Sequence, residues 1–301
     1  MACFHPWKHA IAVGGSQGRR FFDSSEVGLR TLPCGQCLGC RMTRSDEWGT
    51  RIAHEASLHE QNSFVTWTYA DEHLPADFSV SGEVVQKLHR RIRRAGYCHR
   101  FVTAGEYGDD NLRPHYHSII FGQDWSKDRR LWRMSKSGFP LYRSATLERF
   151  WPFGFVEFGD VTAQSGAYVA KYVLKKTNGD RAAEYYRRTH PLTLEVHQVQ
   201  PEFMHMSTNP GIGSGWYERY RSDAFPSDFV TIDGQKRAIP RYYTKKLQAE
   251  DTSAARRDLA TVKHSRAVQG RVHADNNTPE RLATREELKH INANLFRRNV
   301  E

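Results

Sequence analysis

Short segments rich in β-branched, aromatic and apolar residues, bounded by turn residues, run through the chain up to about residue 160 and predict strands. Segment 63–69 is rich in β-branched and aromatic residues, which favours a strand. Segments 99–107 and 115–122 predict two more strands, and the turn-rich segment 108–111 between them predicts a hairpin. A further strand is expected over 153–161. The first half of the chain therefore has the pattern of a small sheet.

Helical periodicity marks other parts of the chain. Over 41–61 apolar residues repeat every four positions, which favours a helix. Ser81 is placed to cap a second helix that has one apolar face. Ser165 or Gly166 would begin a third helix. Residues 247–301 are polar and charge-rich, and we expect them to form peripheral helices.

The helix expected after Ser81 is strongly basic on its polar faces, through Lys87, Arg90, Arg91, Arg93 and Arg94. Such a face can contact phosphates, and it can equally be an ordinary solvated surface. We assign DNA binding to the basic residues Arg90, Arg91, Arg94 and Arg113.

Composition and charge narrow the class of protein. The chain has 301 residues, of which 39% are hydrophobic and 12% aromatic, as expected of a globular protein with a sizeable core. Its net charge of +10 points to a polyanionic partner. The sequence contains neither an apolar run long enough to span a membrane nor the apolar core of a signal peptide, so we expect no membrane contact and residence in a cytoplasm.

Four of the five cysteines lie within the first forty residues, at positions Cys3, Cys34, Cys37 and Cys40. Close spacing with intervening glycines lets thiolates converge on one ion, and four sulfurs complete a tetrahedral Zn²⁺ site. We interpret this zinc as structural, because an all-sulfur shell leaves no open position for chemistry. Reduced thiols, a disulfide and an iron–sulfur cluster are the alternatives.

A second candidate metal site lies on the predicted hairpin. His115 and His117 are two residues apart on one strand, so both imidazoles would project from the same face of a sheet. Glu106 ends the preceding strand, and hairpin pairing would bring its carboxylate beside them. Two imidazoles and a carboxylate with open positions suit Mg²⁺ or Mn²⁺ in a Lewis-acid role. Because the chain has 15 histidines, random placement alone would give roughly 0.7 His-x-His pairs.

Two tyrosines occupy the third expected helix. Tyr168 and Tyr172 are four residues apart, so they share a helix face, and Lys171 and Lys175 each follow a tyrosine by three residues. A nearby ammonium favours the phenolate and neutralises phosphate charge. The alternative is a helix whose tyrosines pack in the core. We assign catalytic roles to Tyr168, Tyr172, Lys171 and Lys175.

The order of these motifs resembles that of the HUH endonucleases. The resemblance rests on Phe64 to Tyr69, then Arg113 to His117, then Tyr168 to Tyr172. Two tyrosines at this spacing resemble the two-tyrosine branch of rolling-circle replication initiators. The segments Cys34 to Cys37, Gly105 to Gly108 and Asn209 to Gly213 look like those of initiators from small single-stranded DNA phages of the microvirus group, especially the gokushoviruses.

The resemblance implies an α+β fold, with a central antiparallel β-sheet flanked by helices in an HUH or RRM-like core. The cysteine spacing adds an N-terminal cysteine-rich zinc element, and the composition of the last residues adds a helical C-terminal extension. The expected division is 1–60 for the zinc element and first helix, 61–180 for the nuclease core and 181–301 for a basic, aromatic and helical part.

The implied activity is metal-dependent nicking and joining of a single-stranded DNA origin in the cytoplasm of a bacterial host. A covalent 5′-phosphotyrosine intermediate would leave a 3′-hydroxyl for a host polymerase, with a host helicase as a second partner and no small-molecule cofactor. Two alternatives stay open. One is a non-catalytic, zinc-containing nucleic-acid-binding protein, and the other is a transposase or relaxase on the same fold.

Overall fold

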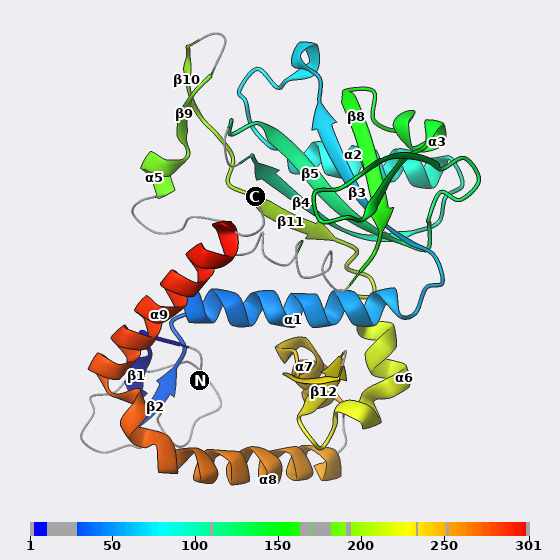
Figure 1. Cartoon of the computed structure of the whole chain (residues 1–301). Helices are drawn as coiled ribbons and strands as arrows, with labels where there is room; N and C mark the ends of the chain where they lie inside the picture. Colours follow the sequence, from blue (N-terminus) through cyan, green and yellow to red (C-terminus); the bar gives the residue numbers. More distant parts are fainter. Residues whose placement is uncertain are drawn as a thin grey trace. The chain divides into compact units, whose positions relative to one another are not determined.

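A computed structural model of the chain describes residues 3–10, 29–108, 111–162, 169, 182–190, 194–232, 234–250 and 253–298. The chain folds into two units, one formed by Met1–Arg44 with His264–Glu301 and the other by Ser45–Lys263. The positions of the units relative to one another are not determined (Figure 1). The three-part division expected from the sequence stays a prediction.

The unit Ser45–Lys263 is organised around a seven-stranded antiparallel sheet with the strand order β11-β4-β5-β3-β8-β7-β6 (Figure 1). The four strands expected from the sequence are present as β3 (Asn62–Tyr69), β4 (Arg100–Tyr107), β5 (Pro114–Phe121) and β8 (Gly154–Asp160). The predicted hairpin joins β4 to β5. The expected α+β class and its antiparallel sheet are confirmed.

Three strands of the sheet were not predicted: β6 (Arg130–Met134), β7 (Pro140–Arg143) and β11 (Phe203–Met206). All five residues of β6 are exposed, and all four of β7 and of β11 are half-buried. A strand without a buried face has no alternation of hydrophobic and polar residues for a sequence pattern to reveal.

The two faces of the sheet are covered by different elements. On one face α2 (Gly82–Arg94) buries Val85, Leu88 and Ile92 in a cluster that includes Trp67 and Tyr116. Figure 1 shows α2 behind the sheet. The helix begins after Ser81 as predicted, although the Ser81 side chain makes no capping hydrogen bond.

The other face of the sheet packs against α1 (Leu38–Ala56), which begins earlier than predicted, inside the cysteine cluster. Its Ile52 joins a buried cluster with Ile119 of β5, Ile212 and Val169. Val169 is helical and fully buried. It is the one described residue of the helix expected to begin at Ser165 or Gly166, and the rest of that helix lies outside the described residues.

A buried glutamate joins α1 to the rest of this unit. Glu55 is 2% exposed and accepts hydrogen bonds from the Arg100 side chain at the start of β4 and, at 2.7 Å, from the backbone N–H of Gly213. Gly213 caps α6 (Ser214–Ala224) at a φ of +79°, and a Cβ there would collide with the Tyr243 hydroxyl. The glycine therefore supplies both the left-handed backbone and the space that this junction needs.

Smaller elements complete the two units. The unit Ser45–Lys263 also contains the helices α3 (Ala145–Glu148), α5 (Ala182–Tyr185) and α7 (Arg241–Ala249). It contains two small antiparallel sheets of two strands each. One pairs β9 (Arg187–Thr189) with β10 (Val196–Gln198), and the other pairs β12 (Phe229–Ile232) with β13 (Gln235–Ala238). The other unit pairs β1 (Trp7–Ala10) with β2 (Leu29–Leu32). The expected C-terminal helices are α8 (Ser253–Gly270) and α9 (Pro279–Arg298). No described helix is long and apolar enough to cross a membrane.

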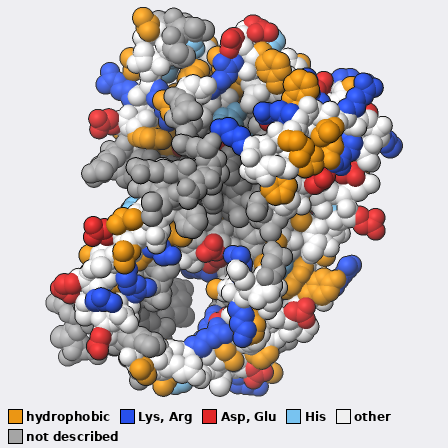
Figure 2. Space-filling view, in the orientation of Figure 1, with side chains coloured by type: hydrophobic (Ala, Val, Ile, Leu, Met, Phe, Trp, Pro, Cys, Tyr) orange, Lys and Arg blue, Asp and Glu red, His pale blue; other side chains and the backbone are white. Residues whose placement is uncertain are grey.

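One stretch of surface carries more apolar side chains than its surroundings. Figure 2 shows hydrophobic side chains gathered among lysines and arginines at the upper right, over the β8 end of the sheet. The exposed large hydrophobic residues of the neighbouring strands and turn are Leu131, Trp132, Met134, Phe139 and Phe155.

A chain of hydrogen bonds between buried polar side chains crosses the α2 side of the sheet. It runs from Trp67 through Ser118, Thr103, His89 and His99 to the Tyr97 carbonyl, with separations of 2.8 to 2.9 Å. The indole at one end can only donate and the carbonyl at the other can only accept. If each group between them accepts one bond and donates one, both imidazoles are neutral, in agreement with burial, which lowers the pKa of His89 and of His99.

We expect the protein to lose stability in mild acid, because its buried histidines stay neutral while those of the unfolded chain take up protons. Burial lowers the pKa of His54 to about 4 and that of His99 to about 4, against about 6.5 in an unfolded chain. Their contribution to the free energy of unfolding is therefore complete above about pH 6.5, and it is lost as the pH falls towards about 4. The loss is about 1.4 kcal/mol per pH unit for each histidine.

His54→Phe isolates one of these contributions. Urea unfolding of the wild type and of this variant gives the free energy of unfolding between about pH 6 and about pH 5. The slope of that energy against pH should be smaller in the variant by about 1.4 kcal/mol per unit, because other titrating groups are common to both proteins. Equal slopes would show that His54 is protonated in the folded state.

Candidate metal centres

The middle of the sheet brings together Glu106, His115 and His117. Glu106 on β4 lies directly opposite His115 on β5 in the antiparallel register. His117 follows His115 by two residues and points to the same face. This is the arrangement that the hairpin predicted.

The three side chains converge on one point. The Nε2 atoms of His115 and His117 lie 2.6 Å and 3.1 Å from Oε1 of Glu106. One ligand atom from each residue lies within 4.8 Å of the others. Glu106 is 2% exposed and His117 is 6% exposed, so the group is shielded from bulk water.

The other ring nitrogen of each histidine, Nδ1, has a hydrogen-bond partner on the side away from Glu106. Nδ1 of His115 lies 3.0 Å from the backbone carbonyl of Arg113, and Nδ1 of His117 lies 3.1 Å from the Thr66 hydroxyl. A carbonyl oxygen accepts only, so Nδ1 of His115 donates to it, and Nε2 is the ring nitrogen that faces Glu106. Partners at Nδ1 orient imidazoles in the same way in metal sites.

The charge of Glu106 is stabilised by its neighbours. Burial raises the pKa of the Glu106 carboxyl, but hydrogen bonds to His115 and His117 outweigh burial and hold that pKa well below its usual range. The group therefore stays ionised. Two imidazole nitrogens and one carboxylate are a donor set that fits a divalent cation, which would also balance the charge of the buried carboxylate.

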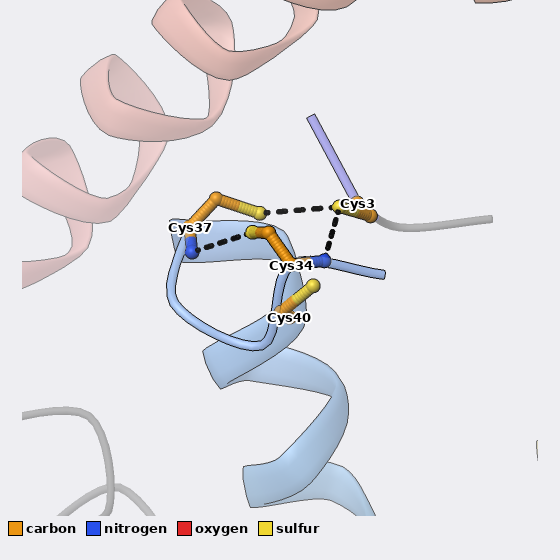
Figure 3. A group of neighbouring side chains, drawn as sticks. All are labelled: Cys3, Cys34, Cys37 and Cys40. Carbon is orange, nitrogen blue, oxygen red and sulfur yellow. Dashed lines mark hydrogen bonds between the residues drawn. The ribbon is translucent and has the colours of Figure 1, made fainter. Parts of the chain in front are cut away.

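The four cysteines near the N-terminus form a second group (Figure 3). Their Sγ atoms all lie within 4.8 Å of one another, and those of Cys3 and Cys37 are 3.9 Å apart. Sulfurs about 3.8 Å apart are what tetrahedral zinc requires, given Zn–S bonds of about 2.3 Å. The geometry therefore fits the predicted all-sulfur site.

Backbone N–H groups donate hydrogen bonds to these sulfurs and favour the thiolate form of Cys37. Cys37 and Cys34 donate from their backbone nitrogens to Sγ of Cys34 and of Cys3, at 3.3 Å and 3.2 Å. Phe4 donates to Sγ of Cys37 at 3.3 Å. Burial raises the pKa of the Cys37 thiol, yet these and neighbouring hydrogen bonds lower it to about 7. Cys98, the fifth cysteine, is exposed.

The predicted catalytic residues Tyr168, Tyr172, Lys171 and Lys175 lie outside the described residues. Val169 alone is described, and it packs in the cluster beside Ile119 and Phe121 of β5. These two residues continue the face of His115 and His117 along the strand. Val169 therefore packs against the same face of the sheet that carries the candidate metal ligands.

The arginines assigned to DNA binding lie in two places. Arg113 donates to Asp71 at 2.6 Å and to the Tyr69 carbonyl at 2.7 Å, so its guanidinium is held against β3. Arg90 and Arg94 are exposed on α2, and Arg91 is half-buried over the Phe153 ring. α2 covers the face of the sheet opposite to Glu106. Their role in DNA binding stays a prediction.

Related proteins cover most of the chain. A family model for replication-associated proteins of the ORF2 type matches residues 62–177. The replication-associated protein VP4 of Bdellovibrio phage phiMH2K is 31% identical over 258 residues, which are 81% of this chain and 76% of that protein. The chain belongs to the family of microvirus-like phage replication-associated proteins.

Other members of the family show similar coverage. The replication-associated protein ORF2 of Spiroplasma virus 4 is 28% identical over 277 residues, covering 83% of this chain and 81% of that protein. The replication-associated protein ORF4 of Chlamydia phage 1 is 28% identical over 232 residues, covering 73% of this chain and 55% of that protein. No solved structure matches the chain. The segment matched by the family model contains Glu106, His115 and His117.

Sequence reasoning missed the residues that orient the histidines. Thr66 was assigned to a strand, and nothing in its own sequence context marks it as part of a site. It faces His117 because β3 pairs with β5 in that register. Aligning the two predicted strands as neighbours would have revealed it, but β3 and β5 are separated by α2 and β4, and their pairing is not a local property of the sequence.

Thr66→Val should weaken binding of Mn²⁺ at the Glu106 site by about tenfold, because loss of an orienting partner typically lowers metal affinity by ~10- to 100-fold. The hydroxyl is replaced by a methyl of similar size, so packing is preserved. Isothermal titration calorimetry with Mn²⁺ measures the effect. Thr68→Val is the matched control, since Thr68 lies two residues along the same strand and hydrogen-bonds the Phe155 carbonyl instead. Equal affinities in the two variants would exclude an orienting role for Thr66.

Cys37→Ser should remove most of the zinc from the purified protein, because a serine hydroxyl does not replace a thiolate ligand. Elemental analysis of the wild type should give about one zinc ion per chain. The variant Cys98→Ser, which changes the exposed cysteine, should keep the zinc content of the wild type. Iron in place of zinc, or an unchanged zinc content in Cys37→Ser, would contradict the all-sulfur zinc site.

Proposed function

We propose that this chain initiates rolling-circle replication by nicking and rejoining single-stranded DNA at an origin. The relatives are named replication-associated proteins of phages. The observation that carries the chemical part is the convergence of His115, His117 and Glu106 on one point of a sheet. The net charge of +10 suits a DNA partner.

Each of the three residues would supply a ligand to the proposed metal site. His115 and His117 would offer their Nε2 lone pairs, and Glu106 would offer a carboxylate oxygen and its negative charge. A divalent ion such as Mg²⁺ or Mn²⁺ held there supplies Lewis-acid polarisation of a phosphate oxygen. The Arg113 carbonyl and the Thr66 hydroxyl keep both rings in the required orientation, which limits the reorganisation needed during the reaction.

The proposed nucleophile is the hydroxyl of Tyr168 or Tyr172. Its oxygen would form a bond to phosphorus while the bond from phosphorus to the 3′ oxygen breaks, and the departing oxygen would take up a proton. The products are a 5′-phosphotyrosine ester and a free 3′-hydroxyl. Lys171 and Lys175 would favour the phenolate and offset phosphate charge. Val169, which lies between the two proposed tyrosines in the sequence, is buried beside β5 on the face of the candidate metal ligands.

The covalent ester explains how one protein could both cut and rejoin a strand. Attack by a 3′-hydroxyl on the phosphotyrosine reverses the first step and needs no external energy source, because the ester conserves the energy of the broken bond. With two tyrosines, one could hold the displaced strand while the other cuts the regenerated origin. A host polymerase would extend the 3′ end, and a host helicase would separate the strands.

The test is formation of a covalent protein–DNA adduct. Labelled single-stranded origin DNA is incubated with Mn²⁺ and the wild type, Tyr168→Phe, Tyr172→Phe or the double variant, and adducts are separated under denaturing conditions. Each single variant should retain an adduct, and the double variant should form none. Glu106→Gln keeps the side-chain shape without the charge and should lower the rate by at least about tenfold.

The outcomes separate the alternatives. No adduct with the wild type, combined with tight DNA binding, would support a non-catalytic nucleic-acid-binding protein. An adduct that persists in the double variant would exclude these tyrosines as the nucleophiles. Sequencing the cut site distinguishes an initiator from a transposase or relaxase, because an initiator should cut one position in a circular phage genome.

A further inference from the structure

A groove begins along the exposed side of α2, which covers the face of the sheet opposite to Glu106, and continues to the end of the sheet where β4 starts and β11 ends. It consists of two cavities of about 420 Å³ and about 480 Å³ that share Arg93 and Phe101. The C-terminal half of α2 forms one wall, and the start of β4 forms the floor. The segment after β11, with Ser207, Thr208 and Asn209, closes the far end.

The described charged residues that line this groove are all basic. They are Arg90, Arg93, Arg94 and Arg100. Arg100 is already paired with the buried Glu55. Arg90, Arg93 and Arg94 are exposed and form no ion pair with a described carboxylate. On the same helix Lys87 is already paired with Glu83 at 2.7 Å. Three guanidinium groups therefore remain available for an anionic ligand.

The positions of these arginines suit a repeating anion. Arg90, Arg93 and Arg94 lie within little more than one turn of α2, so their Cα atoms span about 6 Å along the helix axis. A DNA strand carries one charge per ~3.4 Å of helix axis, so two or three successive phosphates could be contacted together. Guanidinium groups bind phosphate oxygens in bidentate geometry.

The floor of the groove offers no surface for stacking bases. Phe101 is only 8% exposed, because the His89 ring stacks on it with centroids 3.5 Å apart and Arg93 lies over it at 5.4 Å. His89 is itself 1% exposed and belongs to the buried polar chain. The groove is thus stiff and basic, which suits contact with a phosphate backbone and not base recognition.

We propose that this groove holds the phosphodiester backbone of DNA at a distance from the phosphate that is cut. The proposal rests on the proposed function for the identity of the polyanion. Because α2 and Glu106 lie on opposite faces of the sheet, the phosphates held by the α2 arginines are not the reacting one. The groove refines the assignment from sequence, since Arg93 belongs to it and Arg91, which packs over Phe153, does not line it.

The test is the salt dependence of DNA binding by Arg90→Ala/Arg93→Ala/Arg94→Ala. Both this variant and the reference carry Tyr168→Phe/Tyr172→Phe, so that no covalent adduct contributes. Fluorescence anisotropy with single-stranded and duplex oligonucleotides gives Kd over a range of salt concentrations. Each lost phosphate contact should reduce the slope of log Kd against log salt by about 0.7 for a single strand or about 0.9 for a duplex. The total reduction should be about 2, with Kd raised at least about tenfold at physiological salt.

The matched control is Lys127→Ala/Arg130→Ala/Arg219→Ala, which removes the same charge from exposed positions outside the groove. It should change the slope by less than about 0.5, because only general attraction is reduced. Thermal unfolding should show that both triple variants remain folded. Equal slopes for the groove variant and the control, with either form of DNA, would overturn the proposal. The form of DNA with the larger loss is the one that the groove holds.

Failure of the groove can be told apart from failure of the proposed function. In one outcome the wild type forms no covalent adduct, while the groove variant still shows a smaller slope of log Kd against log salt than its reference. The proposed nicking function is then wrong, and the proposal that the groove binds DNA is supported. If the wild type nicks DNA and the slopes are equal, the function stands and the groove is wrong.

Discussion

The candidate site depends on the antiparallel register of three neighbouring strands. β5 lies between β4 and β3, so Glu106 faces His115 across one pairing and Thr66 faces His117 across the other. Side chains alternate between faces with a period of two, and a slip of one residue in β5 would turn both imidazoles away from Glu106. The register therefore decides whether a ligand set exists at all.

The register is fixed because the side chains on both faces of β5 pack against specific partners. Ile119 and Phe121 continue the face of the histidines into one buried cluster, while Tyr116 and Ile120 enter the cluster beneath α2. Between them Ser118 joins the polar chain, where it accepts from the Trp67 indole and contacts Thr103 at 2.8 Å. A slipped strand would leave these buried polar groups unpaired, and each unpaired group costs roughly 1–3 kcal/mol. The polar chain thus stiffens the metal site from the opposite side of the sheet.

Sequence reasoning recovered the strands that local composition and turn residues mark. β3, β4, β5 and β8 were predicted from segments rich in β-branched, aromatic and apolar residues and from the turns that bound them, and hairpin pairing brought Glu106 to His115. β6, β7 and β11 were missed because they lack a fully buried face. The partners of Arg113 were also missed, since Asp71 and the Tyr69 carbonyl meet it only after β3 and β5 have paired. Likewise, the basic residues of α2 were visible in the sequence, but the face of the sheet that α2 covers is a tertiary property.

The separation of α2 from Glu106 has an energetic consequence for the proposed reaction. β4 contributes to both faces, with Phe101 in the groove and Glu106 at the metal ligands, about 17 Å apart along the strand at ~3.3 Å per residue. Phosphates held in the groove undergo no change in bonding during cleavage, so their contacts are equally strong before and during the reaction. Such uniform binding raises affinity without lowering the barrier to cleavage. The barrier must instead be lowered by groups that meet the reacting phosphate on the Glu106 face. The groove would act throughout the covalent intermediate, when release of the free 3′ end would end replication.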